Sequence, residues 1–253
     1  MNNKIVTIVT VTYNCESVIE KTLKSVINQS FQHIEYIVVD GNSTDRTCQL
    51  INKYKNHIDL FICEPDSGIY DAMNKGIFHA NGEWIIFMNA GDVFHDSDVL
   101  SNVFRGMRYN KNIGVIHGDY CSIFKGHKEY HHLVPFYKRT NLYRGMGFSH
   151  QATFVRTKLA RQMPFDLSYK LAADYNMIWN MYYNKKVEFL MIALPIAIMD
   201  QAEGATVRNY RKHLVEVCNI CGVPKGLRRT LLIYYKLFRY RLQHIKNSFE
   251  YDS

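Results

Sequence analysis

Apolar positions in the first hundred residues alternate between strand-like runs and helix-like spacings. Residues 4–12 form a nearly continuous β-branched run, as expected for a strand buried on both faces of a parallel sheet. Further strands are expected at 34–40, 58–63 and 83–88, and helices at about 18–29, 44–54 and 70–80, the second capped by Ser43. This alternation predicts an α/β fold with a mainly parallel, doubly wound sheet flanked by helices.

The rhythm of the sequence changes after residue 110. Residues 113–134 have the pattern of short strands separated by turn signals, which predicts a two-stranded ribbon, and residues 150–155 indicate another strand. A helix is expected next, then a pair of strands, and finally two helices, at 172–183, 187–199, 207–221 and 227–245 respectively. We therefore expect residues 1–110 and 111–205 to form two halves of one domain, followed by a helical segment at 206–253.

Polar side chains come directly after the predicted strands of the first half. Tyr13 follows the first strand, Asp40 ends the second, Asp66 follows the third and Asp92 follows the fourth. Ligands of parallel α/β sheets bind beyond the carboxyl ends of the strands. Four such positions in succession predict a binding site along this edge of the sheet.

Charge is unevenly distributed along the chain. The formal net charge is +8, and from Lys212 onward eight Lys or Arg residues stand against three acids. Between 226 and 248, Leu, Tyr and Phe recur among these basic residues. A basic amphipathic helix with aromatics is typical of contact with an anionic membrane surface. The same pattern fits a helix that packs on the domain with its charges in solvent, so both interpretations stay open.

Cysteine usage and hydropathy bear on the compartment. The six cysteines lack the spacing of a disulfide framework, which favours reduced thiols in the cytoplasm. Cys218 and Cys221 form one CxxC pair, but no second pair completes a zinc site. No run of about 18 apolar residues indicates a membrane span, and the N-terminus lacks a signal-peptide pattern. We expect a cytoplasmic protein, which contacts the inner face of the cell membrane if the first interpretation of the basic helix holds.

Five short motifs occur in a characteristic order: TVTYN, VVDGNSTDRT, EPDSGIYDAMNKG, NAGD and AADYN. Together they resemble family 2 glycosyltransferases over roughly the first 200 residues. The resemblance implies a GT-A fold, the nucleotide-diphospho-sugar transferase fold, with a catalytic domain at 1–205. It also implies inverting transfer of a hexose or N-acetylhexosamine from a nucleotide sugar, with UDP favoured, to a hydroxyl of a polyprenyl-pyrophosphate-linked or oligosaccharide acceptor in surface-polysaccharide synthesis.

The same resemblance implies which residues bind the nucleotide. Thr12 and Tyr13 would offer backbone contacts and an aromatic face to the base, and Asp40 would accept a hydrogen bond from a ring N–H. Asp66 and Asp71 would contact base and ribose. Asp40 can equally be a turn residue, and Asp71 can interact with the dipole of the helix that it begins.

Asn89-Ala90-Gly91-Asp92 stands where the family has an acidic metal-binding motif. Asp92 would bind Mg²⁺ or Mn²⁺, because hard cations prefer carboxylate oxygens, and Asn89 would hydrogen-bond the ribose. Such an ion offsets the charge that grows on the departing diphosphate. Gly91 contributes only backbone, and the alternative for the four residues is a plain turn.

Asp174 matches the family's catalytic carboxylate. An inverting transferase needs a base that takes the proton of the acceptor hydroxyl; the alternative is a first-turn helix acid. His150 lies in a segment similar to one that borders the acceptor, and an imidazole can donate to phosphate or sugar.

Three other functions are compatible with parts of the sequence. A sugar nucleotidyltransferase usually has a glycine-rich phosphate loop after its first strand, and TYNCE contains no glycine. A catalytically impaired nucleotide- or lipid-binding protein of the same fold stays open because the acidic motif is thinned. Nucleic-acid binding is disfavoured, since the basic tail lacks a recognised module.

Overall fold

The computed structural model describes residues 4–104, 110, 112–124, 127–132, 149–185, 187–200 and 209–251. The strands in chain order are β1 (Val6–Thr12), β2 (Ile34–Asp40), β3 (Leu60–Cys63), β4 (Trp84–Phe87), β5 (Val93–Phe94), β6 (Ile113–Phe124), β7 (His127–His131), β8 (Thr153–Arg156) and β9 (Glu188–Asp200). Within the described residues they form one sheet in the order β3-β2-β1-β4-β8-β6-β9-β5, with β7 paired to β6. The predicted α/β fold is confirmed.

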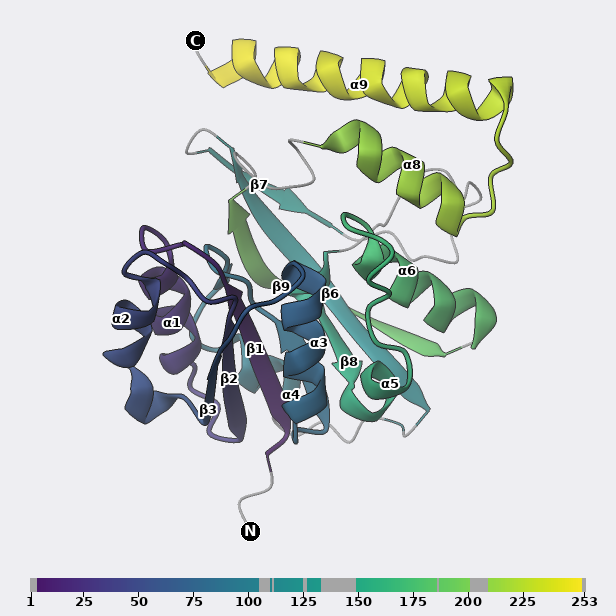
Figure 1. Ribbon diagram of the computed structural model, residues 1–253. Coiled ribbons are helices and arrows are strands. Elements are labelled where there is room, and N and C mark those ends of the chain that lie inside the picture. The colour runs from purple at the N-terminus through teal and green to yellow at the C-terminus, as the bar shows by residue number, and fades with distance from the viewer. Residues whose placement is uncertain are drawn as a thin grey trace.

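Helices flank this sheet, and the last two lie above it (Figure 1). They are α1 (Ile19–Ile27), α2 (Thr47–Asn52), α3 (Ile69–His79), α4 (Val99–Phe104), α5 (Thr157–Gln162), α6 (Ala173–Trp179), α8 (Tyr210–Ile220) and α9 (Leu227–Tyr251). A short 3₁₀ turn at His150–Ala152 precedes β8, and a π-helical turn at Asn180–Asn184 extends α6.

The parallel strands β1, β2 and β4 are buried, β1 on both faces as the sequence predicted, whereas the edge strand β3 is only partly buried. β1 pairs in parallel with β2 and β4, and β2 pairs with β3. Alternate residues of β1 enter two different cores, Val6 and Ile8 on one face and Val9 and Val11 on the other. Because neighbouring side chains of a strand point to opposite faces, an unbroken β-branched run can fill both cores.

The second half of the sheet is mixed. β8 is antiparallel to both β4 and β6, whereas β9 runs parallel to β6. The predicted strand pair at 187–199 is wrong, because β9 is one strand from Glu188 to Asp200. Pro195 does not end it, since Pro195 lies opposite Asp119 at an irregularity of the pairing, where a missing N–H is tolerated.

The start of α2 also differs from the expectation. The helix begins at Thr47, whose N–H donates to Asp45 Oδ1 at 2.9 Å. Ser43 does not cap it, because the Ser43 hydroxyl is 2.7 Å from Asp40 Oδ2 and donates to it. Asp45 therefore supplies the side-chain bond expected of Ser43.

The last two helices pack one on the other above the sheet (Figure 1). α8 contacts α6 through Val217, Ala172 and Tyr175, and α9 contacts α8 through Ile233 and Leu214. None of the helices in the described ranges combines the length and apolar character needed to span a bilayer. The predicted domain boundary at 205 lies outside the described residues.

Candidate active site

The loops after β1 and β2 are joined by side-chain hydrogen bonds. Asn14 accepts from the Thr44 N–H at 2.9 Å and donates its own N–H to Ser43 Oγ at 2.9 Å. Asn14 has φ of 47°, a left-handed conformation that asparagine adopts more readily than most residues. The neighbouring Tyr13 side chain stays 63% exposed at the mouth of this loop pair. The structure thus presents an aromatic ring at the carboxyl end of β1.

Asp40 is fully buried at the end of β2, where groups of the chain donate to both of its carboxylate oxygens. Oδ2 accepts from the Thr12 hydroxyl at 2.6 Å and the Ser43 hydroxyl, and Oδ1 accepts from the Ser43 N–H at 2.7 Å. The thiols of Cys48 and Cys63 also reach Oδ1. Burial raises the pKa of Asp40, but these donors outweigh burial and leave the pKa below its usual value. Asp40 therefore organises the loops, and a contact with a base stays a prediction.

Tyr13, Gly41 and Asp66 meet where β1, β2 and β3 end. A Cβ atom at Gly41 would lie 2.5 Å from Asp66 Oδ2 and 3.3 Å from Tyr13 Cδ2. A side chain at position 41 would clash with the Asp66 carboxylate, so only glycine lets this carboxylate and the Tyr13 ring lie against the backbone. A flat heterocycle with N–H donors fits such a surface.

Two carboxylates accept hydrogen bonds from the backbone of the loop before α3. Asp66 Oδ1 accepts from the Gly68 N–H at 2.8 Å, and Asp71 Oδ2 accepts from the Ser67 N–H at 2.9 Å. Gly68 has φ of +122°, which side chains rarely adopt. Asp71 thus has a structural role at the helix start, and its predicted contact with the nucleotide stays a prediction.

Asn89-Ala90-Gly91-Asp92 folds as a tight turn. The Asp92 N–H donates to the Asn89 carbonyl at 2.9 Å, and Gly91 has φ of +98°, as a type II turn requires at its third residue. The hydroxyl of Thr22, in α1, accepts from the Gly91 N–H at 2.9 Å and donates to the Asp92 carbonyl at 2.8 Å. The turn brings the side chains of its first and last residues to the same edge of the sheet.

A chain of hydrogen bonds connects this turn to the start of α6. Asn89 Nδ2 is 3.1 Å from His150 Nε2, and His150 Nδ1 is 3.1 Å from Asp174 Oδ2. The hydroxyl of Tyr70, in α3, donates to Asp174 Oδ1 at 2.9 Å. A carboxylate only accepts, so His150 donates from Nδ1 and holds Asp174 in place.

These contacts set the ionisation of Asp174. Burial alone would raise the pKa of Asp174, but the hydrogen bond and charge of His150, followed by the Tyr70 hydrogen bond, lower it below its usual value. The pKa of Tyr70 is raised well above its usual value by burial and by the Asp174 charge. Asp174 is therefore a carboxylate at neutral pH, with Tyr70 as a neutral donor.

Asp92 is hydrogen-bonded to Gln151, the residue that follows His150. Gln151 Nε2 donates to Asp92 Oδ2 at 3.0 Å, so the adjacent His150 and Gln151 hold Asp174 and Asp92 respectively. Asn89 Oδ1 is buried and has no hydrogen-bond partner in the described part of the chain. An orphaned amide oxygen three residues from a carboxylate fits the oxygen preference of Mg²⁺ or Mn²⁺. Asp92 and Asn89 are the residues that would hold such an ion.

The helix α8 also contributes to this site. Both carboxylate oxygens of Glu216 accept backbone N–H groups, from Lys170 at 3.0 Å and from Leu171 at 2.9 Å. These two residues lie just before α6, which carries Asp174 in its first turn. Glu216 thereby fixes the segment that positions Asp174.

The structure brings Asn89, Asp92, His150 and Asp174 together, and it places Thr12, Tyr13, Asp40 and Asp66 along the neighbouring strand ends. The Asp71 side chain instead accepts from the Ser67 N–H at the start of its own helix, α3.

Sequence reasoning missed four contributors, namely Thr22, Tyr70, Gln151 and Glu216. Each acts on a residue at least 45 positions away, and the only available signal was the position of Gln151 next to His150.

Comparison with known proteins bears directly on this arrangement. Residues 7–166 match the model of Glycosyl transferase family 2. The chain is 30% identical over 175 residues to an uncharacterized glycosyltransferase of Mycobacterium tuberculosis, covering 68% of this chain and 67% of the relative. The chain therefore belongs to glycosyl transferase family 2 and is a glycosyltransferase.

Solved structures share the fold. S. aureus TarS in complex with UDP-GlcNAc superposes with a TM-score of 0.67 at 20% identity, covering 90% of this chain and 70% of that chain. The mannosyltransferase PcManGT from Pyrobaculum calidifontis, in complex with GDP-Man and Mn²⁺, gives 0.65 at 18% identity, covering 92% and 69%. At these identities the likeness shows the GT-A fold alone.

Proposed function

We propose that the chain is an inverting glycosyltransferase that moves a hexose or N-acetylhexosamine from a nucleotide sugar, UDP favoured, to an acceptor hydroxyl. The observation that supports this most is the bridge of His150 and Gln151 between Asp174 and Asp92. These adjacent residues link Asp174, a carboxylate suited to accept a proton, to Asp92, a carboxylate suited to bind the cation of a diphosphate. TarS and PcManGT, which share the fold, were crystallised with UDP-GlcNAc and with GDP-Man and Mn²⁺.

The donor nucleotide would lie along the ends of β1, β2 and β3. Tyr13 supplies an exposed ring for the base to stack on, and Asp66 supplies an acceptor beside Gly41. The diphosphate would then reach Asp92 and Asn89. When bound there, a divalent cation supplies positive charge that offsets the charge of the departing diphosphate.

Asp174 is the proposed base. As a carboxylate it accepts the proton of the acceptor hydroxyl while that oxygen attacks the anomeric carbon from the face opposite the leaving group. His150, Tyr70 and the Tyr175 N–H each hydrogen-bond the Asp174 carboxylate, which has about four lone-pair sites, so one is left to accept the proton. In this proposal the residues that bind the donor nucleotide and its cation lie within 1–110, and the base lies within 111–205.

A screen of donors tests this proposal. UDP-Glc, UDP-Gal, UDP-GlcNAc and GDP-Man are each incubated with the full chain and Mn²⁺, and release of the nucleoside diphosphate is measured. We expect release from at least one donor, dependent on the metal and lost in Asp92→Ala. Asp174→Asn should bind UDP in calorimetry yet transfer about 10²- to 10⁴-fold more slowly. Nucleotide binding without turnover, for all donors and for a panel of lipid-linked and oligosaccharide acceptors, would favour the catalytically impaired alternative.

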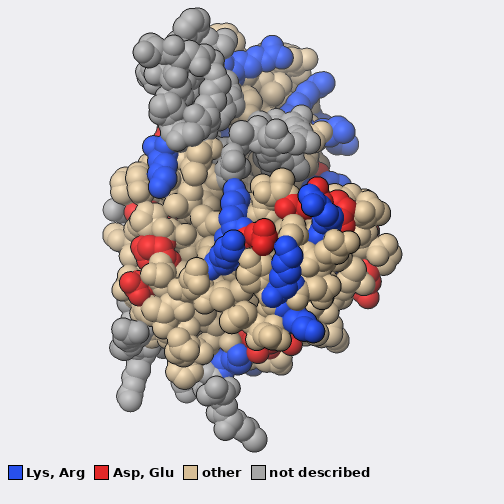
Figure 2. Space-filling model, turned by 90° about the vertical axis from the view of Figure 1, so that its left-hand side faces the viewer, with Lys and Arg blue, Asp and Glu red and all other residues tan. Residues whose placement is uncertain are grey.

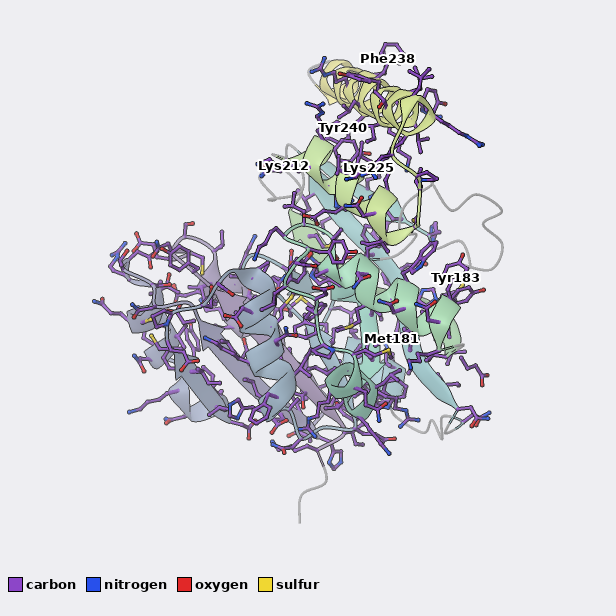
Figure 3. The ribbon with its side chains drawn as sticks, turned by 45° about the vertical axis from the view of Figure 1, so that its right-hand side comes forward. Met181, Tyr183, Lys212, Lys225, Phe238 and Tyr240 are labelled. Carbon is purple, nitrogen blue, oxygen red and sulfur yellow. The ribbon has the colours of Figure 1, made fainter. Side chains whose placement is uncertain are left out.

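An apolar stripe on α9 bears on the kind of acceptor that the protein uses. Six large side chains at helical spacing are 49–75% exposed, namely Leu227, Leu231, Tyr234, Tyr235, Phe238 and Leu242. Phe238 points away from α8, whereas Tyr240 lies between the two helices and stacks on Tyr210 at 4.1 Å (Figure 3). One face of α9 therefore packs on α8, as expected for a helix that covers the domain. The opposite face is exposed and has the apolar and basic character expected for contact with a membrane.

Basic side chains accompany this stripe. Lys225, Arg228, Arg239 and Arg241 are exposed, and residues 225–242 contain no Asp or Glu. Figure 2 shows blue Lys and Arg side chains among tan ones on the upper part of the molecule, where α9 lies. We propose that this face rests on an anionic membrane and brings the site to a polyprenyl-pyrophosphate-linked acceptor.

Co-sedimentation with vesicles tests the membrane contact. The chain should bind vesicles that contain an anionic phospholipid and not purely zwitterionic ones, and Phe238→Ser or Arg239→Glu should weaken binding about tenfold. Phe78→Ser is the matched control, because Phe78 is 75% exposed on α3. Equal sedimentation of the α9 variants and the control would contradict the membrane contact.

A further inference from the structure

Two thiols and a carboxylate lie close together beneath the loops that follow β1 and β2. Cys48 lies in α2, Cys63 ends β3, and Asp40 ends β2 directly beside Cys63 in the strand pairing. Cys48 Sγ is 3.2 Å from Asp40 Oδ1, Cys63 Sγ is 3.6 Å from the same oxygen, and the two sulfurs are 3.6 Å apart. Three potential ligand atoms from three elements therefore form a small triangle.

The size of this triangle matches one face of a tetrahedral zinc site. Metal–sulfur bonds of about 2.3 Å and metal–oxygen bonds of about 2.0 Å at tetrahedral angles place two sulfurs about 3.8 Å apart and a sulfur and an oxygen about 3.5 Å apart. The observed distances differ from these by a few tenths of an ångström. A cation could be held with small movements of the side chains.

The surroundings also suit a cation. Cys63 is exposed and Cys48 is half-buried, so an ion can reach the thiols from solvent and keep a water as its fourth ligand. Asp40 Oδ2 is held by the hydroxyls of Thr12 and Ser43, which fixes the carboxylate as outer-shell contacts do in metal sites. Two sulfurs favour zinc over the hard cations expected at Asp92.

We propose that Asp40, Cys48 and Cys63 form a second cation site, distinct from the site at Asp92 and selective for a thiophilic divalent ion of the Zn²⁺ class. On binding, each thiol loses its proton to solvent, two metal–sulfur bonds and one metal–oxygen bond form, and the S–H hydrogen bonds to Asp40 are replaced. The ion would tie α2, β2 and β3 together directly below Gly41.

Titration with Co²⁺ as a spectroscopic probe tests this site independently of catalysis. The full chain, kept reduced with a phosphine, is titrated while the thiolate-to-cobalt charge-transfer absorption is recorded. We expect one tightly bound Co²⁺ per chain that Zn²⁺ displaces. Cys48→Ser and Cys63→Ser should each weaken binding by at least about 100-fold, the upper end of what a lost outer-shell contact costs. The double variant Cys218→Ser/Cys221→Ser is the matched control and should bind as the unmodified chain does.

Thiol protection gives a second readout that needs no variant. Zn²⁺ should slow alkylation of Cys48 and Cys63, measured peptide by peptide in mass spectrometry, and leave the rate at Cys15 unchanged. Absence of the charge-transfer band, or a band that survives in both single variants, would overturn the proposal. Equal alkylation rates with and without Zn²⁺ would overturn it as well.

Discussion

His150 links two parts of the site that lie far apart in the sequence. Its two ring nitrogens contact Asn89 and Asp174, which come from chain segments 85 positions apart. The hydrogen bond and charge of His150 lower the pKa of Asp174 against the effect of burial. At this scale, chemistry depends on pairs of side chains that the chain brings together from distant segments.

Removal of His150 should change the pH dependence of transfer. Asp174 acts when deprotonated, and its pKa lies below the usual value while His150 is present. In His150→Ala that pKa rises, so the acidic limb of the kcat/KM profile should move to higher pH. The measurement is kcat/KM across the acidic range for the variant and the unmodified chain. An unchanged limb together with a uniformly lower rate would contradict the assigned role of His150.

Tyr13 carries a prediction about nucleotide affinity. Stacking of a base on an aromatic ring is worth about 1–3 kcal/mol, so Tyr13→Ala should weaken UDP binding about tenfold or more. The free energy of unfolding should change little, because the side chain is 63% exposed. Calorimetry with UDP measures the affinity, and Tyr13→Phe, which keeps the ring, is the matched control. Equal losses in both variants would argue against stacking.

At the scale of elements, the C-terminal helices support the segment that carries Asp174. α8 holds the segment before α6 through Glu216, and α9 covers α8 with one face. The tail predicted from sequence as a separate basic segment therefore also positions Asp174. The carboxyl ends of β1, β2 and β3 point toward the end of the molecule on which α8 and α9 lie, and the N-terminus lies at the opposite end (Figure 1).

Glu216→Ala should lower transfer without affecting nucleotide binding. The change removes two hydrogen bonds to backbone N–H groups that water can partly replace, so the free energy of unfolding should fall by only about 1 kcal/mol. Loosening of the start of α6 misplaces Asp174, and kcat should fall about tenfold or more. Glu129→Ala, at an exposed acid on β7, is the control. A loss of UDP affinity equal to the loss in kcat would contradict the positioning role.

α3 and β1 give a prediction about packing. Gly76 faces β1 so closely that an added Cβ would lie 2.5 Å from Val9 Cγ1. Gly76→Ala should therefore lower the free energy of unfolding by about 1–3 kcal/mol, as overpacked cores do, despite the better helix propensity of alanine. Denaturant unfolding measures this, and an unchanged or raised midpoint would show that α3 can move away from the sheet.

At the scale of the whole molecule, local pattern predicted the parallel half of the fold well. Strands of uniform β-branched character, such as β1, are recognisable because burial on both faces leaves a continuous apolar run. The single strand β9 was missed because Pro195 sits at a pairing irregularity that no local signal reveals. The strand-end residues could be placed on one edge of the sheet, but the hydrogen bond of Tyr70 to Asp174, 104 positions away, depends on tertiary packing.

The proposed function requires that one site at this sheet edge hold a nucleotide diphosphate and its metal beside Asp174. A crystal structure of Asp174→Asn with UDP and Mn²⁺ tests it most directly. The predicted result is a uracil against Tyr13 and Gly41, with Mn²⁺ bound to Asp92 and the β-phosphate next to residue 174. A nucleotide bound elsewhere, or a metal bound to the phosphates without contact to Asp92, would contradict the account.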